Sequence, residues 1–145
     1  MTAAYKAFFD TSVLVAAFLG DHDHHGPCLD VLSKMTPDTG ACAAHSLSEF
    51  YSVTTRMPLR PKILPEQSIL FLEDVERRLK PIALTAKQYR ECIQDAAKQH
   101  IIGGQTYDAV ILACARTCNT ERIYTLNQKH FVRIAPDLRD RIRRP

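Results

Sequence analysis

The stretch AFFDTSVLVAAFLG, residues 7–20, joins a short apolar run to an apolar helix through one acid and two hydroxyl residues. Residues 7–9 are expected to form a buried strand, and residues 13–19 predict a helix that ends at Gly20. Asp10 then lies on the turn between the two elements. A strand–turn–helix unit of this kind is typical of a parallel sheet whose strands are joined by helices.

The rest of the chain repeats this alternation. Apolar spacing and turn signals predict helices over residues 22–35, from Ser46, over 66–80, from Thr85 to near Gly103 and over 107–118, and strands over 41–44, 82–84, 122–126 and 132–135. Short strands that alternate with helices imply parallel pairing through right-handed crossovers. We therefore predict an α/β fold, a three-layer α/β/α sandwich with a short parallel sheet of about four or five strands, in a single domain over residues 1–145.

Length and composition exclude several classes of protein. A chain of 145 residues with 46% apolar residues is long enough for one hydrophobic core. The longest apolar stretches, residues 13–19 and 109–115, are far shorter than the roughly 20 residues of a membrane span. A signal peptide is not expected, since Lys6 is followed by only three apolar residues, and five cysteines without a Cys-x-x-Cys motif favour reduced thiols. These features predict a globular, cytoplasmic protein with no membrane segment.

The net charge of +3 comes from the arginine-rich end of the chain. Residues 133–145 contain five arginines and two aspartates, so the first 132 residues are neutral overall. Arginine binds phosphate oxygens through two N–H groups at once, which favours contact with a nucleic acid. A charged terminus is also typical of a solvated tail, and the composition of residues 136–145 leaves both interpretations open.

Asp10 follows the first predicted strand directly. Ligands of parallel α/β sheets bind at the carboxyl ends of the strands, so this acid is a candidate for a binding or catalytic role. Its alternative role is to cap the following helix, as aspartate often does at this position. Thr11 or Ser12 could provide the cap instead and leave Asp10 free.

Asp108 lies near the start of the helix predicted over residues 107–118, on the same face as Ile111 and Leu112. Burying an unpaired anion costs several kcal/mol, whereas the helix dipole contributes only about 0.3 to 1 kcal/mol. We therefore expect a cation or several hydrogen-bond donors beside this carboxylate. Stabilisation by the helix terminus alone is the alternative.

Glu49 has a simpler explanation, because Ser46 and Glu49 have the spacing of a capping box. It becomes a candidate through its combination with Asp10 and Asp108. Three carboxylates that converge without a cation repel each other and raise one another's pKa. A set of oxygen ligands without histidine or cysteine favours Mg²⁺ or Mn²⁺.

Four segments follow one another in order: FFDTSVL (residues 8–14), SLSEFY (46–51), YDAVILA (107–113) and YTLNQKHF (124–131). Together they resemble the ordered motifs of PIN-domain ribonucleases, in particular the VapC-type toxins of bacterial and archaeal toxin-antitoxin pairs. The resemblance covers residues 8–135, almost the whole chain, and makes the expected fold PIN-like.

This resemblance implies a Mg²⁺- or Mn²⁺-dependent endoribonuclease that leaves a 5′-phosphate and a 3′-hydroxyl. It also implies a homodimer and a cognate small antitoxin that holds the toxin inactive. By position, Asp10, Glu49 and Asp108 match the metal-site acids of the family. Asn127 stands at a fourth catalytic position that is often aspartate; its amide oxygen can bind a cation but adds no negative charge.

The polar residues Thr11, Ser12 and Thr125 match family positions expected to orient the carboxylates or bound water. Single-stranded or looped RNA is the expected substrate, because its bases and backbone are exposed. The exposed apolar face of the helix predicted over residues 66–80, or of the first helices, is the candidate surface for a second protomer or the antitoxin. Candidates for contact with RNA phosphates are Arg56, Arg60, Lys62, Arg139 and Arg141.

Other interpretations fit part of these observations. A catalytically silent PIN-like module would bind RNA or a partner without cutting, which the amide of Asn127 favours. A phospho-acceptor receiver domain also has acids at the edge of an α/β sheet, but it pairs acids early in the chain and places a lysine after a late strand. A zinc site would lack a second pair of ligands at a usual distance. Its candidate ligands are His22, His24, His25 and Cys28, with Asp21 or Asp23.

Overall fold

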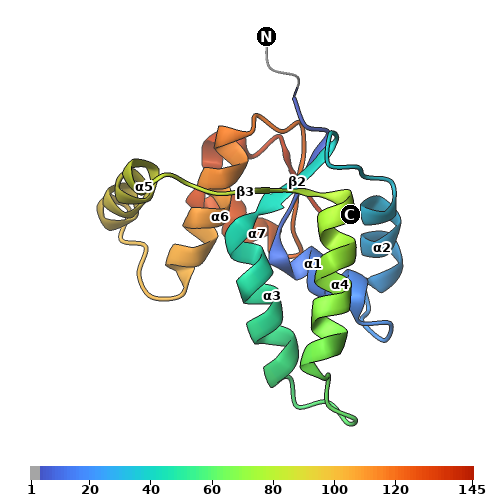
Figure 1. Ribbon diagram of the computed structural model, residues 1–145. Coiled ribbons are helices and arrows are strands. Elements are labelled where there is room, and N and C mark those ends of the chain that lie inside the picture. Colours follow the sequence, from blue (N-terminus) through green and yellow to red (C-terminus); the bar gives the residue numbers. More distant parts are fainter. Residues whose placement is uncertain (1–3) are drawn as a thin grey trace.

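The computed structural model describes residues 4–145 (Figure 1). Residues 1–3 of the predicted domain lie outside the described residues. Along the described chain the elements are β1 (Ala7–Phe9), α1 (Thr11–Phe18), α2 (His25–Ser33), β2 (Gly40–Ala43), α3 (Ala44–Arg56), α4 (Pro65–Arg78), β3 (Lys80–Ile82), α5 (Ala86–Lys98), α6 (Gln105–Thr117), β4 (Ile123–Tyr124), α7 (Gln128–Ile134), the 3₁₀ turn η1 (Pro136–Leu138) and β5 (Ile142–Arg143).

The described strands form one five-stranded parallel sheet in the order β3-β2-β1-β4-β5. At its centre, Phe8 of β1 lies beside Ala41 of β2 and Ile123 of β4. The chain moves outward from β1 to β3 and then returns to the other side of β1 at β4. This confirms the predicted α/β fold, and the reversal places a binding crevice at the carboxyl ends of β1 and β4.

The strand order rules out the receiver domain. Receiver domains have the flavodoxin-like order 2-1-3-4-5, in which the third strand lies next to the first. Here β3 lies at one edge of the sheet and is separated from β1 by β2. The receiver interpretation is therefore wrong.

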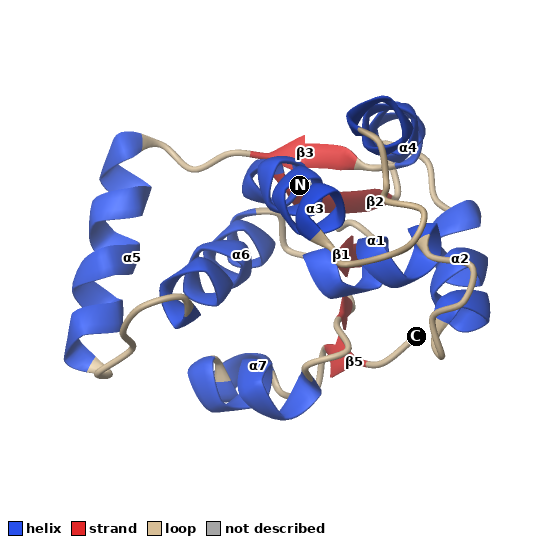
Figure 2. Ribbon diagram, turned by 90° about the horizontal axis from the view of Figure 1, so that it is seen from below, coloured by secondary structure: helices blue, strands red, loops and turns tan. Residues whose placement is uncertain are grey.

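Two hydrophobic cores lie on the two faces of the sheet, with α1, α2 and α4 on one side of the strands and α6 and α7 on the other (Figure 2). Phe8 and Phe9 are adjacent in β1 and point to opposite faces, as successive strand residues do. Phe8 packs in the core that α6 and α7 cover, and Phe9 packs in the other core. Burial on both faces explains why this strand is an unbroken apolar run.

Helices α3 and α4 lie side by side and extend beyond the carboxyl ends of the strands (Figure 1). The hydroxyls of Thr54 and Ser68 share a buried hydrogen bond of 2.9 Å. Phe50 stacks on Phe71 with ring centroids 5.2 Å apart. These contacts hold the two helices together as a hairpin, and residues 57–64 form the loop at its far tip.

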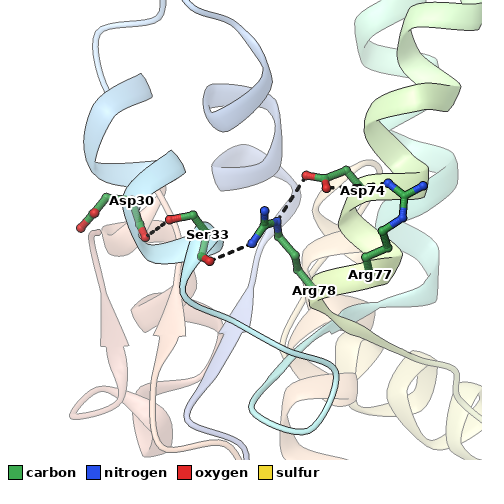
Figure 3. Close-up of polar contacts among 5 residues, drawn as sticks. All are labelled: Asp30, Ser33, Asp74, Arg77 and Arg78. Carbon is green, nitrogen blue, oxygen red and sulfur yellow. Dashed lines mark hydrogen bonds and ion pairs between the residues drawn. The ribbon is translucent and has the colours of Figure 1, made fainter.

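An arginine fixes the returning end of α4 to α2 (Figure 3). Arg78 donates to the backbone carbonyl of Ser33 at 2.7 Å and pairs with Asp74 at 3.3 Å. The guanidinium is thus held between the two helices. It keeps α4 against α2, where α4 leads back into the sheet at β3.

The strand predicted over residues 132–135 is wrong, because these residues belong to the end of α7 and the position that follows it. Phe131 and Ile134 are one helical turn apart and are buried together. The fifth strand is instead β5 in the arginine-rich end, where Ile142 is fully buried. Residues 136–145 therefore do not form a solvated tail, since Leu138 and Ile142 pack into the core.

Several boundaries also differ from the predictions. Helix α2 begins at His25 rather than residue 22, β3 precedes its predicted range by two residues, and α5 ends at Lys98 rather than near Gly103. The capping box that begins α5 is confirmed. The N–H of Thr85 donates to Gln88 Oε1 at 2.8 Å, and the N–H of Gln88 donates to the Thr85 hydroxyl at 3.1 Å.

All five cysteines are free thiols. Cys28, Cys42 and Cys114 are buried in the two cores, where they act as small apolar residues. Within residues 4–145, no helix has the length and hydropathy needed to cross a membrane.

Candidate active site

Asp10 follows β1 at the carboxyl edge of the sheet and is almost completely buried. It occupies the N-cap position of α1, but its side chain makes no capping bond, so the capping interpretation is wrong. The carboxylate instead accepts hydrogen bonds from the hydroxyls of Ser12, at 2.6 Å, and Thr125, at 2.9 Å. Both bonds end on Oδ2, and no described residue donates to Oδ1.

The two hydroxyls are themselves oriented by the backbone that follows β4. Ser12 Oγ accepts from the N–H of Leu126 at 3.1 Å, and Thr125 Oγ1 accepts from the N–H of Asn127 at 3.0 Å. Because each hydroxyl accepts from the backbone, its proton is directed at Asp10. Ser12 and Thr125 therefore hold Oδ2 of this carboxylate in place.

Thr11 behaves differently from this prediction. Its hydroxyl donates to Ser46 Oγ at 2.8 Å and makes no hydrogen bond to a carboxylate. The bond connects α1 to α3, the helix that carries Glu49. Thr11 thus holds the two acid-bearing segments together rather than orienting an acid directly.

The capping box predicted for Ser46 and Glu49 is wrong. Helix α3 begins at Ala44, with Ala43 at the N-cap position and no side-chain capping bond. The chain passes from β2 into α3 without an intervening turn, so Ser46 lies inside the helix and Glu49 is not needed at its start. This leaves the Glu49 side chain free to face the carboxyl edge of the sheet.

Glu49 and Asp108 line the same pocket as Asp10, although the three acids come from α3, α6 and the end of β1. The pocket has a volume of about 450 Å³. We call it the acid pocket; its polar lining includes Asp10, Ser12, Glu49, Asp108, Asn127 and Arg144. The structure thus brings together the four residues predicted as catalytic, Asn127 among them.

The acid pocket raises the pKa of two of its carboxyl groups. Burial raises the pKa of Asp10 to about 6 against the opposing hydrogen bonds from Ser12 and Thr125, and the charges of Asp108 and Glu49 raise it further. Burial also raises the pKa of Asp108 to about 6, and the charge of Glu49 adds to the effect. The three carboxylates therefore repel one another across the pocket.

Two histidines lie against these acids, and sequence reasoning missed both roles. His130 Nε2 of α7 lies 3.0 Å from Asp108 Oδ2, and His45 Nε2 lies 3.4 Å from Glu49 Oε2. His45 also stacks on Tyr107, and its buried Nε2 has no hydrogen-bond partner among the described residues. The His45–Glu49 pair could be found from its i,i+4 spacing, whereas His130 and Asp108 meet only through the packing of α7 on α6.

The oxygen atoms that line the acid pocket are suitable ligands for a hard divalent cation. Carboxylate and amide oxygens are the ligands that Mg²⁺ and Mn²⁺ prefer, and a cation would relieve the repulsion that raises the pKa of Asp10 and Asp108. Within residues 4–145, no three His, Cys, Asp or Glu side chains are already gathered closely enough to enclose an ion. Each acid instead rests against a hydroxyl or imidazole partner.

The residues of the zinc interpretation have other contacts. Cys28 is fully buried in the core. The ring of His25 lies 2.9 Å from the backbone carbonyl of Ala16, and His22 Nδ1 accepts from the N–H of His24 at 3.0 Å. His25 and Cys28 thus serve the packing of α2, whereas His22 and His24 also line the acid pocket.

The predicted basic residues do not line the acid pocket. Arg56, Arg60 and Lys62 are exposed at the far end of the α3–α4 hairpin. Arg139 and Arg141 precede β5, at the amino edge of the sheet, where Arg141 donates to the carbonyl of Thr120 at 3.4 Å. Because the strands are parallel, these two arginines lie at the opposite edge from the acids.

Arg144 is the arginine that reaches the acid pocket, and sequence reasoning missed it. It follows β5 and so lies at the same edge as Asp10 and Thr125. A second pocket, of about 430 Å³, adjoins the first and shares Arg144 with it. We call it the basic pocket, since no acid lines it; its lining is Leu126, Asn127, Gln128, Lys129, His130 and Arg144.

Comparison with known proteins identifies the family of the chain. The model of the PIN domain family matches residues 7–136. Ribonuclease VapC40 of Mycobacterium tuberculosis is 35% identical over 102 residues, which cover 70% of this chain and 72% of that protein. Ribonuclease VapC27 of the same species is 29% identical over 106 residues, which cover 73% of this chain and 74% of that protein.

Two solved structures share the fold. M. tuberculosis VapC20, described as a Sarcin-Ricin loop cleaving toxin, has a TM-score of 0.69 at 16% identity and covers 86% of this chain and 92% of its own. VapBC2 from Rickettsia felis, bound to a DNA fragment from its promoter, has a TM-score of 0.63 at 21% identity and covers 96% of this chain and 98% of its own. The chain belongs to the PIN-domain family and, within it, to the VapC group.

Proposed function

We propose that this protein is an endoribonuclease that uses Mg²⁺ or Mn²⁺ to hydrolyse RNA and acts as the toxin of a toxin-antitoxin pair. The observation that carries the proposal is the meeting of Asp10, Glu49 and Asp108 in one pocket at the carboxyl edge of the sheet. The ribonuclease names of the VapC relatives support the same activity. An acid cluster with raised pKa values at this edge is typical of a site built for chemistry.

In this proposal Asp10 and Asp108 hold the cation directly, and Glu49 either binds it or orients the attacking water. The bound cation would stabilise negative charge on the phosphate and lower the pKa of that water. Asp10 offers its free Oδ1 while Ser12 and Thr125 hold Oδ2. Asn127 contributes an amide oxygen in the same pocket without adding a negative charge.

The reaction is an in-line hydrolysis of a phosphodiester. Water forms a bond to phosphorus and the bond from phosphorus to the 3′-oxygen breaks. The leaving 3′-oxygen takes a proton from solvent water, so a 5′-phosphate and a 3′-hydroxyl result. Glu49, when it accepts a hydrogen bond from the attacking water, acts as the group that aligns the water and receives its proton. Its position on α3, opposite Asp108 on α6, leaves the pocket between them for the phosphate.

The RNA strand follows the basic pocket next to the acid pocket. Arg144 and Lys129 are exposed there and form no ion pair with a described residue, so both are free to contact phosphates. Arg56, Arg60 and Lys62 at the tip of the α3–α4 hairpin are more distant contacts for a longer strand. Arg139 and Arg141 have no such role in this proposal, because they lie at the opposite edge of the sheet.

A cognate antitoxin and a second protomer are the proposed protein partners, and the cytoplasm is the proposed location. The relative VapBC2, described with promoter DNA, supports an antitoxin. The α3–α4 hairpin exposes large apolar side chains suited to a protein surface. These residues are Leu59, Leu64, Ile69 and Leu70.

The proposal is tested with the purified chain, a labelled RNA, Mg²⁺ or Mn²⁺, and a chelator. We expect cleavage that depends on the metal and is lost in Asp10→Asn and Asp108→Asn. RNA binding without metal-dependent cleavage would identify the silent PIN-like module instead. Cleavage that persists in both variants would indicate a contaminating nuclease and contradict the assignment.

A further inference from the structure

His130 connects two helices at the margin of the acid pocket. Its Nε2 lies 3.0 Å from Asp108 Oδ2, and about a quarter of each side chain is exposed. On its other side, Nδ1 of His130 lies 2.9 Å from Nη2 of Arg133, one helical turn further along α7. The imidazole is therefore held between a guanidinium and a carboxylate.

The tautomer of His130 follows from the chemistry of arginine. A guanidinium nitrogen can only donate, so Nδ1 of His130 accepts from Arg133. The ring proton then lies on Nε2, the nitrogen that lies 3.0 Å from Asp108 Oδ2. The N–H of the imidazole is thus on the side of the carboxylate.

This arrangement leaves one oxygen of Asp108 free. His130 lies against Oδ2, and no described residue makes a hydrogen bond or ion pair with Oδ1. The same division occurs at Asp10, where Ser12 and Thr125 occupy Oδ2. Carboxylates that bind metals are commonly oriented by hydrogen bonds of this kind on the oxygen that the metal does not take.

We propose that His130, fixed by Arg133 as the Nε2–H tautomer, is a positioning residue that orients Asp108 toward a divalent cation in the acid pocket. The inference rests on the proposed metal site and adds a function for two residues of α7. His45 is a weaker candidate for such a role, since its Nε2 lies farther from its acid, 3.4 Å from Glu49 Oε2, and no hydrogen bond from a described residue fixes its tautomer.

The test measures Mn²⁺ binding to the metal-free full-length chain by the loss of the free Mn²⁺ signal in electron paramagnetic resonance. We expect His130→Ala to weaken Mn²⁺ binding by about 10- to 100-fold, the usual effect of removing a group that orients a metal ligand. His130→Gln should restore most of the affinity, because its amide nitrogen reaches a similar position and donates to Asp108. Arg133→Met should give a smaller loss, while the matched variant Arg139→Met should give none.

Cleavage at saturating Mn²⁺ separates positioning from direct participation. The loss of cleavage in His130→Ala should be smaller at saturating Mn²⁺ than at limiting Mn²⁺, because excess metal offsets the weaker site, whereas a contact of His130 with RNA in the basic pocket would be lost equally at both concentrations. Loss of cleavage at saturating metal with unchanged Mn²⁺ affinity would overturn the inference. Unchanged Mn²⁺ affinity in His130→Ala would overturn the inference as well. Equally weak Mn²⁺ affinity in His130→Gln and His130→Ala would also overturn it, because His130 would then be a direct ligand of the metal.

Two controls keep the outcomes distinct. If Asp10→Asn binds Mn²⁺ as well as the unmodified protein, the proposed metal site itself is wrong. If Asp10→Asn loses Mn²⁺ but His130→Ala keeps it, only the positioning inference is wrong. Thermal unfolding in a chelator checks the fold, and should His130→Ala unfold, the affinities of His130→Gln and Arg133→Met decide the question.

Discussion

The two edges of the parallel sheet contain charged residues in different states. At the amino edge, Arg141 donates to a backbone carbonyl, and Arg116 pairs with Asp137 at 2.8 Å. At the carboxyl edge, Asp10 is buried with a pKa of about 6 beside two other acids. At the amino edge an arginine has an acid as its partner, whereas at the carboxyl edge three acids of like charge share one pocket. The gathering of like charges, rather than the number of charges, therefore marks the site.

The largest expected effect separates the acids of the two edges. Asp10→Asn and Asp108→Asn should each lower the rate of metal-dependent RNA cleavage by at least about a thousandfold. Each variant removes a negative charge that binds the cation, and the bound cation stabilises the transition state by several kcal/mol. Asp137→Asn, at the amino edge, should leave the rate unchanged. Initial rates on labelled RNA measure all three, and an Asp10→Asn rate within tenfold of the unmodified protein contradicts the comparison.

The pH dependence of stability provides the next largest effect. Burial raises the pKa of Asp10 in the folded protein to about 6, whereas an aspartate in the unfolded chain has its ordinary pKa of 3.8. The metal-free protein should therefore lose stability as pH rises from about 4 to 6, by about 3 kcal/mol from Asp10 alone. Asp108→Asn should likewise stabilise the metal-free protein at neutral pH by removing repulsion.

Urea unfolding in a chelator at several pH values measures this effect. The difference in stability between Asp10→Asn and the unmodified protein should increase in favour of the variant over this pH range. Adding Mg²⁺ or Mn²⁺ should reverse it above pH 6, because the cation binds the charged form. If the difference in stability between Asp10→Asn and the unmodified protein does not change with pH, the pocket does not raise the pKa of Asp10.

A smaller effect compares two arginines that flank β5. Arg144→Met should lower kcat/KM for RNA by about tenfold, the size expected for losing one charged hydrogen bond to a phosphate. Arg141→Met, on the other side of the same strand, should change it less than about twofold. Steady-state kinetics at two salt concentrations test this, and equal effects of the two variants would remove the distinction between the edges.

The smallest effect concerns a residue near the carboxyl edge with a purely structural role. Thr85→Ala removes the cap of α5 and should lower the free energy of unfolding by about 1 kcal/mol. Mn²⁺ affinity and RNA cleavage should not change, because Thr85 follows β3 at the far side of the sheet. A loss of metal binding in Thr85→Ala would show that the metal site extends beyond the crevice at β1 and β4.

The predictable parts of the molecule are those that local pattern determines. An apolar run followed by an acid identified β1 and Asp10, and the Thr85–Gln88 spacing identified a real cap. The same kind of spacing failed at Ser46 and Glu49, because the helix begins earlier, directly after β2. A capping pattern alone therefore does not fix where a helix starts.

The parts that could not be predicted depend on contacts between distant segments. β5 has two residues, one of them arginine, and is a strand only because it pairs with β4. Residues 132–135 have the short apolar run of a strand, yet Phe131 and Ile134 are buried on one face of α7. Arg144 and His130 reach the site through these same two elements, so neither role could be predicted before the packing was known.

Anomalous diffraction from crystals of the full chain grown with Mn²⁺ tests the central claim most directly. We predict an anomalous peak in the acid pocket, bounded by the carboxylates of Asp10, Glu49 and Asp108, and no such peak in crystals of Asp10→Asn. Mn²⁺ bound elsewhere with no peak in the pocket, or an unchanged peak in Asp10→Asn, would contradict it.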